Sequence, residues 1–247
     1  MKNRYLVIVT MSFIFLTYSY SEEKKWKLVW QDNFFSIDTT CWSKIRHGHG
    51  EWDKFMNDTT KCYRLLKNKI RLYGLKCDST YYTGGLWTKG KRTFREGRIE
   101  IRARFNNTTG AWPAIWLLAE NTKWPKGGEI DIMEHLNGDG FVYQTLHNSF
   151  LQGKGDGPYN QAKGRIKKGK YNIYAVEFDS ACVNFFVNSK KTLTYYKNGK
   201  DEQFPYGDNE YILILSMQLG GRWVGEIKDE TLPAFMDVDW VKYYIKQ

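Results

Sequence analysis

The stretch Gly97–Phe105, which reads GRIEIRARF, decides the fold class of this chain. Its apolar residues Ile99, Ile101, Ala103 and Phe105 alternate with charged residues along the whole stretch. An alternation with a period of two predicts a β-strand that buries one face and exposes the other. The stretch therefore predicts one strand of a sheet with a buried face and a solvated face.

Comparable strand-like runs recur along the chain, and turn signals rich in glycine and asparagine separate them. No stretch shows a convincing helical period. Many short strands without helices predict an all-β sandwich or barrel. Residues 151–170, rich in glycine and lysine, are predicted to be the longest irregular loop. The other strand-like runs are residues 69–73, 171–178, 183–187, 211–219 and 238–245.

The composition is that of a globular protein rather than a disordered chain. Of the 247 residues, 42% are hydrophobic and 26% are charged. The net charge of +10 is scattered and forms no basic arm or helix, so nucleic acid is not a predicted partner. No linker divides the chain, which predicts a single domain.

The N-terminus has the features of a secretory signal peptide. Lys2 and Arg4 precede an apolar stretch, and Ser19 and Ser21 are small residues suited to a cleavage site. A membrane anchor is the alternative, but it needs about 20 apolar residues and this run is shorter. We therefore expect residues 1–21 to be removed. Residues 22–247 would form a secreted, periplasmic or cell-surface domain without stable membrane insertion.

The four cysteines allow disulfides outside the cytoplasm. They permit three fully paired connectivities, which the sequence does not resolve, and buried free thiols are an equal alternative. They are Cys41, Cys62, Cys77 and Cys182.

Residues 127–135, GGEIDIMEH, concentrate three carboxylates. Glu129 and Asp131 share one face of a strand, whereas simple alternation sends Glu134 to the other face. A β-bulge at Ile132 and Met133 would return Glu134 to the face of the other two acids. The segment therefore predicts three carboxylates side by side on a bulged strand.

Adjacent carboxylates raise one another's pKa, which suits a site where one of them must remain protonated. Retaining glycoside hydrolysis uses a nucleophilic carboxylate and a protonated carboxyl close to each other. Two alternatives remain open from the residues alone. The acids could form ion pairs with Arg98 or Arg102 on a neighbouring strand, or they could bind calcium.

Aromatic residues surround this segment. Trp112, Trp116 and Trp124 precede the acids, and indoles in a cleft stack on sugar rings, although any one of them could instead fill the core. His147 lies on the next predicted strand. It could hydrogen-bond a carboxylate or a sugar, and a structural role is the alternative.

The sequence resembles glycoside hydrolase family 16 along nearly all of residues 22–247. The E-x-D-x-x-E core, with its bulge, is similar to the laminarinase-like branch of that family. The resemblance implies a β-jelly-roll sandwich of two antiparallel sheets with an open substrate cleft. The matching motifs are residues 28–34 (LVWQDNF), 97–103 (GRIEIRA), 112–116 (WPAIW), 128–134 (GEIDIME), 220–223 (GGRW) and 239–243 (DWVKY).

The resemblance also implies roles for single residues. Glu129 would be the nucleophile, Glu134 the general acid/base, and Asp131 the residue that tunes their protonation. Trp112, Trp116, Trp124, Trp223 and His147 would line the cleft. Asp239 matches a residue that holds a structural Ca²⁺ in many family members, and a simple turn or edge acid is the alternative.

Some cleft positions depart from the usual β-1,3-glucanase pattern. Leu86 stands where many members carry arginine, and Ser216 stands near an expected asparagine. Residues 51–56 replace a tyrosine-rich loop. Trp52, Gln144 and Gln218 are therefore candidate substrate-binding residues, with packing as the alternative for each.

These features predict a secreted, endo-acting, retaining glycosidase that acts as a monomer and needs no cofactor for its chemistry. A β-1,3- or mixed β-1,3/1,4-glucan is the first expected substrate. The alternatives are an endo-β-1,4-galactosidase acting on mucin O-glycans or keratan-type chains, a transglycosylase, and a non-catalytic glycan-binding protein on the same scaffold.

Overall fold

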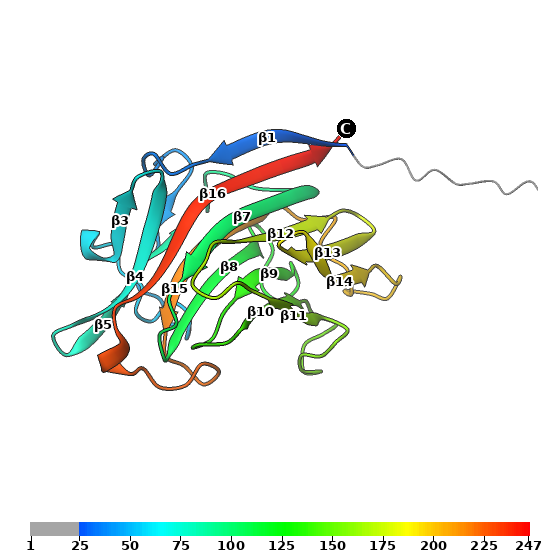
Figure 1. Cartoon of the computed structure of the whole chain (residues 1–247). Coiled ribbons are helices and arrows are strands. Elements are labelled where there is room, and N and C mark those ends of the chain that lie inside the picture. Colours follow the sequence, from blue (N-terminus) through cyan, green and yellow to red (C-terminus); the bar gives the residue numbers. More distant parts are fainter. Residues whose placement is uncertain (1–24) are drawn as a thin grey trace, which may run out of the picture.

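The computed structural model describes residues 25–247, which fold into two antiparallel β-sheets stacked face to face (Figure 1). The predicted signal peptide, residues 1–21, lies outside the described residues. Within residues 25–247 the structure contains two short 3-10 helices, η1 (Thr60–Cys62) and η2 (Asp229–Thr231), and no helix with the length and apolarity of a membrane span.

Nine strands form the first sheet of the described chain, in the order β14-β13-β12-β7-β16-β4-β3, with β1 beside β16 and β5 beside β4. Their bounds are β1 (Trp26–Asp32), β3 (Tyr63–Leu66), β4 (Lys69–Cys77), β5 (Thr80–Thr83), β7 (Gly97–Phe105), β12 (Asn172–Phe178), β13 (Cys182–Val187), β14 (Lys190–Tyr196) and β16 (Ala234–Lys246).

Seven strands form the second sheet of residues 25–247, in the order β11-β10-β9-β8-β15-β6-β2. Their bounds are β2 (Ser43–Lys44), β6 (Gly85–Trp87), β8 (Ala111–Ala119), β9 (Glu129–Glu134), β10 (Phe141–His147), β11 (Gln161–Arg165) and β15 (Tyr211–Leu219).

The strand predictions are confirmed. The strands predicted at 97–105 and 211–219 have the predicted bounds, and the other four lie within or around the predicted runs. The loop prediction for residues 151–170 is wrong in part, because β11 lies inside it as an edge strand paired with β10. The sequence of β11, QAKGR, carries almost no apolar alternation, since an edge strand buries little of its surface.

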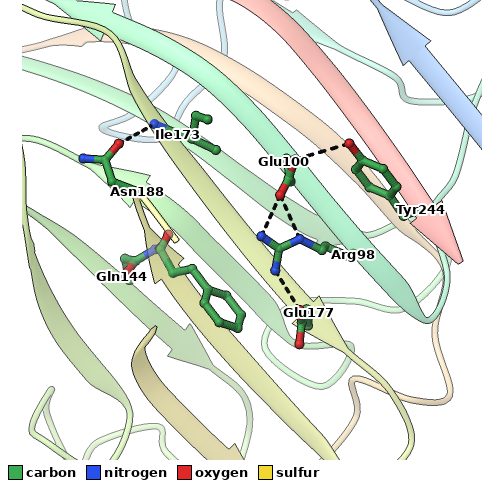
Figure 2. A network of polar contacts seen from close by, with 8 residues as sticks. Arg98, Glu100, Gln144, Ile173, Glu177, Asn188 and Tyr244 are labelled. Carbon is green, nitrogen blue, oxygen red and sulfur yellow. Dashed lines mark hydrogen bonds and ion pairs between the residues drawn. The ribbon is translucent and has the colours of Figure 1, made fainter. Parts of the chain in front are cut away.

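The core lies between the two sheets. The alternating residues of β7 show the arrangement, because Ile99, Ile101 and Ala103 are fully buried in it. The charged residues between them lie on the outer face of the first sheet. There Arg98 donates hydrogen bonds to Glu100 and Glu177, as Figure 2 shows.

The outer face also holds a fully buried carboxylate. Asp237 on β16 accepts two hydrogen bonds from Arg71, at 2.6 and 2.9 Å, and one from Arg104 at 2.9 Å. Both arginine side chains are partly exposed. This ion-pair cluster connects β4, β7 and β16 of the first sheet. The predicted catalytic segment lies on the second sheet.

A second, smaller apolar cluster lies on the opposite face of the second sheet. It contains Ile45 and Met56 from the segment before β3, and Trp116 and Ile214 from β8 and β15. Trp52 packs against this cluster. The segment around Trp52 thus covers one end of the face on which the predicted catalytic residues lie.

Three of the cysteines are free thiols: Cys41 and Cys62 are buried, and Cys77 is half-buried. The Sγ atom of Cys182 accepts a hydrogen bond from Asn184. The structure therefore agrees with the free-thiol alternative for the first three.

Candidate active site

The predicted β-bulge is present in β9. On β8, Ala114 and Trp116 are two residues apart, whereas their partners on β9, Glu134 and Asp131, are three apart. The pairing with β10 shifts at the same place, between Tyr143 and Thr145. The extra residue turns the strand by one position, so that Glu134 returns to the face of the other acids.

The cross-strand register places each acid between residues that face the same way. On β8 the partners of Glu129, Asp131 and Glu134 are Leu118, Trp116 and Ala114. On β10 the partner of Glu129 is His147 and that of Asp131 is Thr145. Because side chains alternate along each strand, these residues form one continuous floor on the outer face of the second sheet.

A cavity of about 350 Å³ lies over this floor. All three acids line it, together with Ala114, Leu118 and Gln218. Four indoles complete the lining: Trp52, Trp112, Trp116 and Trp124. A cleft with aromatic walls and three carboxylates at its floor can stack sugar rings and carry out acid–base chemistry on them.

Glu129, Asp131 and His147 are in close contact. Each offers a carboxylate oxygen or ring nitrogen within 4.8 Å of the others. His147 Nε2 lies 3.2 Å from Asp131 Oδ2. Asp131 is almost fully buried, whereas Glu129 and His147 are partly exposed to the cleft. Asp131 thus lies beneath the other two and can influence both.

Glu134 has a different partner. The indole Nε1 of Trp112 donates a hydrogen bond of 3.0 Å to its Oε1. Trp112 in turn packs edge-on against Trp223, with ring centroids 5.4 Å apart, and Trp223 packs against Tyr143. The sequence did not reveal this contact, because Trp112 and Glu134 meet only through the register of β8 and the bulge of β9.

Burial and mutual repulsion raise the pKa of all three acids. Burial, and then the charge of Asp131, raise the pKa of Glu129 to about 8, while His147 and the Trp124 side chain act to lower it. Burial and the charges of both other acids raise the pKa of Glu134 well above its usual range, against the hydrogen bond from Trp112. Since two carboxylates repel the ionised form of Glu134, a proton is favoured there.

The pKa of Asp131 is raised as well, first by burial and then by the charge of Asp156. Asp156 lies in the segment between β10 and β11, where Asn160 Nδ2 donates a 3.0 Å hydrogen bond to it. No sequence pattern singles out Asp156, because it lies among glycines and lysines in a stretch without periodicity.

A second cavity of about 260 Å³ continues the cleft past the acids. Trp112, Glu129 and Glu134 line both cavities, so the two carboxylates lie where the cavities meet. The remaining lining residues of the second cavity are Thr145, His147, Asp156, Gln161 and Trp223. A cleft that extends on both sides of the acids suits a chain bound across them.

The structure thus brings most of the predicted site residues together. The three acids, Trp52, Trp112, Trp116, Trp124 and Gln218 line the first cavity, and His147 and Trp223 line the second. Thr145, Asp156 and Gln161 are cleft residues that the sequence did not single out.

Two cleft predictions are wrong. Gln144 is fully buried and faces the core, because it alternates with Tyr143 and Thr145 on β10. Its Nε2 donates a 2.8 Å hydrogen bond to the carbonyl of Ile132 in the bulge, and its Oε1 accepts one of 2.6 Å from Thr192. Gln144 therefore supports the bulge and does not reach the cleft.

Leu86 was placed in the cleft by its expected equivalence to an arginine, and it is fully buried in the core between the sheets. Its neighbour Gly85 lies on the cleft side instead, where an added Cβ would meet Ile45 and Met56. Ser216, paired with Gly85, lies on that side beneath Trp116.

The structure also bears on the two alternative roles of the three acids, which are ion pairing with an arginine and calcium binding. Arg98 and Arg102 bond to Glu100, Glu177 and Asp239 on the outer face of the first sheet, so they do not pair with the cleft acids. Calcium prefers oxygen ligands, and the group of Glu129 and Asp131 includes the nitrogen of His147, so the donor set does not favour calcium there.

Asp239, the predicted calcium ligand, has an arginine partner. Its Oδ2 forms an ion pair with Arg102 across β16 and β7. A guanidinium against the carboxylate does not suit a calcium ion at this position, and the calcium site stays a prediction.

Comparison with known proteins agrees with this geometry. The family model described as "Glycosyl hydrolases family 16" matches residues 52–242. A keratan-sulfate endo-1,4-beta-galactosidase of Sphingobacterium multivorum is 31% identical over 237 residues, covering 89% of this chain and 55% of its own length. A beta-glucanase of Rhodothermus marinus is 29% identical, covering 89% of this chain and 85% of its own length.

A solved structure with a similar fold comes from work on endo-acting O-glycanases that members of the human gut microbiota express to initiate mucin breakdown. It has a TM-score of 0.83 and 28% sequence identity, and the match covers 90% of this chain and all of that one. The chain spans about half the length of the Sphingobacterium relative. With the family model covering most of the described residues, this chain belongs to glycosyl hydrolases family 16.

Proposed function

We propose that this protein is an endo-acting glycoside hydrolase that cleaves β-linkages with retention of configuration. The observation that carries the proposal is the bulge of β9, which places Glu129, Asp131 and Glu134 in one aromatic cleft. The cleft extends on both sides of Glu129 and Glu134, which suits cleavage within a chain.

In the first step, Glu129 attacks the anomeric carbon while Glu134 gives its proton to the leaving oxygen. The glycosidic carbon–oxygen bond breaks, and an ester bond forms between the sugar and Glu129. In the second step, Glu134 takes a proton from water, which attacks the same carbon and releases Glu129. The raised pKa of Glu134 supports its role as the proton donor.

Asp131 is proposed to set the protonation of its two neighbours. Its negative charge raises the pKa of both Glu129 and Glu134. His147, 3.2 Å from Asp131, limits that effect when it donates to the carboxylate. The pair would thus hold Glu134 protonated while leaving Glu129 able to ionise.

For the substrate, we propose a galactose-based glycan of the keratan or mucin type first, and a β-1,3- or mixed-linkage glucan second. The keratan-sulfate endo-galactosidase and the structure from the O-glycanase work support this order. It reverses the order expected from the sequence. The glucan alternative retains the support of the Rhodothermus beta-glucanase.

Secretion is part of the same proposal. The basic and apolar pattern of residues 1–21 supports export, and residues 22–247 would then be the catalytic domain acting on polysaccharides outside the cytoplasm.

A product profile tests the proposal. Wild type and Glu129→Gln are incubated with keratan, mucin O-glycans, laminarin and barley mixed-linkage glucan, and the oligosaccharides are sized over time. We expect internal cleavage of the galactose-based chains by wild type and none by Glu129→Gln, because the substitution removes the nucleophile.

Products from the glucans alone would make glucan the substrate and leave the mechanism unchanged. Products that become longer over time than the oligosaccharides first released would indicate transglycosylation. Binding without any product from the whole panel would contradict the hydrolase proposal and favour a glycan-binding protein.

A further inference from the structure

Gln218 occupies an unusual place in the first cavity. It lies on β15, paired in register with Trp112, and its side chain lines the cavity together with the three acids. It is only 2% exposed, so its amide is withdrawn from bulk water.

The amide of Gln218 is held in one orientation. Its Nε2 donates a 2.8 Å hydrogen bond to Ser216 Oγ, and the same hydroxyl accepts a 3.2 Å hydrogen bond from Trp116 Nε1. Trp116 is itself packed edge-on against Trp52, with ring centroids 5.0 Å apart. Two fixed indoles and one serine therefore determine where the Gln218 carbonyl oxygen lies.

That carbonyl oxygen, Oε1, has no hydrogen-bond partner among the described residues, although it is buried. A buried acceptor without a donor is unfavourable, and native structures satisfy nearly all such groups. Its in-register neighbour on β8 is Trp112, whose indole Nε1 already donates its hydrogen bond to Glu134, so this indole does not supply the donor. The cavity that Gln218 lines is the space next to this amide, and we take its occupant to supply the donor.

We propose that Gln218 is a specificity-determining residue that binds a sugar unit beside the catalytic acids through a hydroxyl or acetamido N–H donated to Oε1. The inference rests on the proposed function, since it takes the occupant of the cavity to be part of a glycan. A neutral sugar meets both features of the site: its ring stacks on the indoles, and its polar group supplies the donor. Ser216 acts as a positioning residue, because it reaches the ligand only through the amide that it orients.

Binding to an inactive enzyme tests this role separately from turnover. In the Glu129→Gln background, calorimetry measures the affinity for laminarihexaose and for a hexasaccharide of N-acetyllactosamine. Adding Gln218→Met keeps the side-chain length and removes the acceptor. We expect affinity to fall about fivefold to tenfold, the loss typical of one uncharged hydrogen bond.

Two further variants keep the result interpretable. Ser216→Ala leaves the amide in place but frees its orientation, so we expect a smaller loss with the same ligand preference. Gln31→Met changes an exposed glutamine on β1, outside the cleft, and should leave affinity unchanged. Thermal unfolding of each variant shows whether it is folded. If Gln218→Met is not folded, the smaller loss of affinity expected for Ser216→Ala becomes the test of the inference.

An equal loss with both hexasaccharides would identify a hydroxyl as the donor, and a loss confined to N-acetyllactosamine would identify the acetamido N–H. Unchanged affinity for both ligands in folded Gln218→Met, or no binding of either ligand by the parent, would overturn the inference. Binding that depends on Gln218 in a protein whose wild type yields no product would instead retain the inference and contradict the hydrolase proposal.

Discussion

Replacement of Trp112 by phenylalanine isolates one contact that sets the protonation of Glu134. The Trp112 indole donates its hydrogen bond to Glu134 Oε1, and this contact favours the ionised carboxylate. Phenylalanine keeps an aromatic ring in the cleft and loses the donor. The pKa of Glu134 should therefore rise further in Trp112→Phe.

The size of the shift follows from the hydrogen bond. A hydrogen bond to a charged group contributes about 1.5–3 kcal/mol, and one pKa unit corresponds to about 1.4 kcal/mol. The upper limit is therefore about 1–2 units. Glu134 remains 8% exposed, so water in the cleft can replace part of the lost bond, and we expect a shift of about 1 unit.

The pH dependence of kcat/KM measures this shift. A general acid must be protonated in the free enzyme, so loss of activity at high pH reports the pKa of Glu134. We expect this basic limb to move to higher pH by about 1 unit in Trp112→Phe, together with a lower maximal rate.

Trp223→Phe is the matched control. Trp223 packs on Trp112 and also lines the cleft, but Glu134 takes its hydrogen bond from Trp112. The control should weaken substrate binding and leave the basic limb in place. A limb that stays fixed or moves to lower pH in Trp112→Phe would refute the reasoning, as would an equal shift in Trp223→Phe.

Three other predictions concern the support of the site and the stability of the fold. Asp237→Asn removes the buried carboxylate held by two arginines and should lower the free energy of unfolding by about 2–4 kcal/mol. This loss is smaller than for fully buried partners, because both arginines are partly exposed. Urea denaturation measures the loss, and an unchanged midpoint would contradict the prediction. Gln144→Leu removes the hydrogen bond to the bulge carbonyl of Ile132 and should lower kcat about tenfold with little change in KM. Thr192→Val removes only the hydrogen bond that Thr192 donates to Gln144, and it should have a smaller effect on kcat. Equal kcat in Gln144→Leu and wild type would show that the bulge keeps its geometry without this hydrogen bond. Glu129→Gln should unfold at higher denaturant concentration than wild type at pH 8 and at the same concentration near pH 4. The pKa of Glu129 is raised from 4.5 to about 8, so between these values the unfolded chain ionises at this position while the folded state keeps the proton, and wild type alone loses stability as the pH rises. A constant difference across that range would contradict the assigned shift.

Strand pattern and the acid motif were predictable because both follow from alternation. The residues of β7 alternate between buried and partly exposed in register with their sequence, so its bounds could be read directly. β15 is buried along its whole length, and its bounds followed from the extent of its largely apolar run. The bulge was predictable for the same reason: Glu134 breaks the alternation that Glu129 and Asp131 establish, and an extra residue restores it.

The two misplaced residues, Gln144 and Leu86, were misplaced for different physical reasons. Gln144 is polar but core-facing, because its amide satisfies backbone and hydroxyl groups inside the sandwich, and sequence polarity does not report such partners. Leu86 was assigned by equivalence rather than by register, and one position along β6 separates the cleft side from the core.

The contacts that tune the site were not predictable from the sequence. The bond between Trp112 and Glu134, and the effect of Asp156 on Asp131, join residues that are more than twenty positions apart. They depend on the pairing of β8 with β9 and on the path of an irregular segment, and neither has a local sequence signal.

The central claim is that Glu129 is the nucleophile and Glu134 the general acid/base. Azide rescue of Glu129→Ala and Glu134→Ala on an activated aryl β-glycoside, with the product's anomeric configuration read by NMR, tests it most directly. We predict an α-glycosyl azide from Glu129→Ala, because azide then attacks the substrate directly, and a β-glycosyl azide from Glu134→Ala, because azide then attacks the enzyme-bound intermediate. The reverse configurations, or no rescue of either variant, would contradict the assignment.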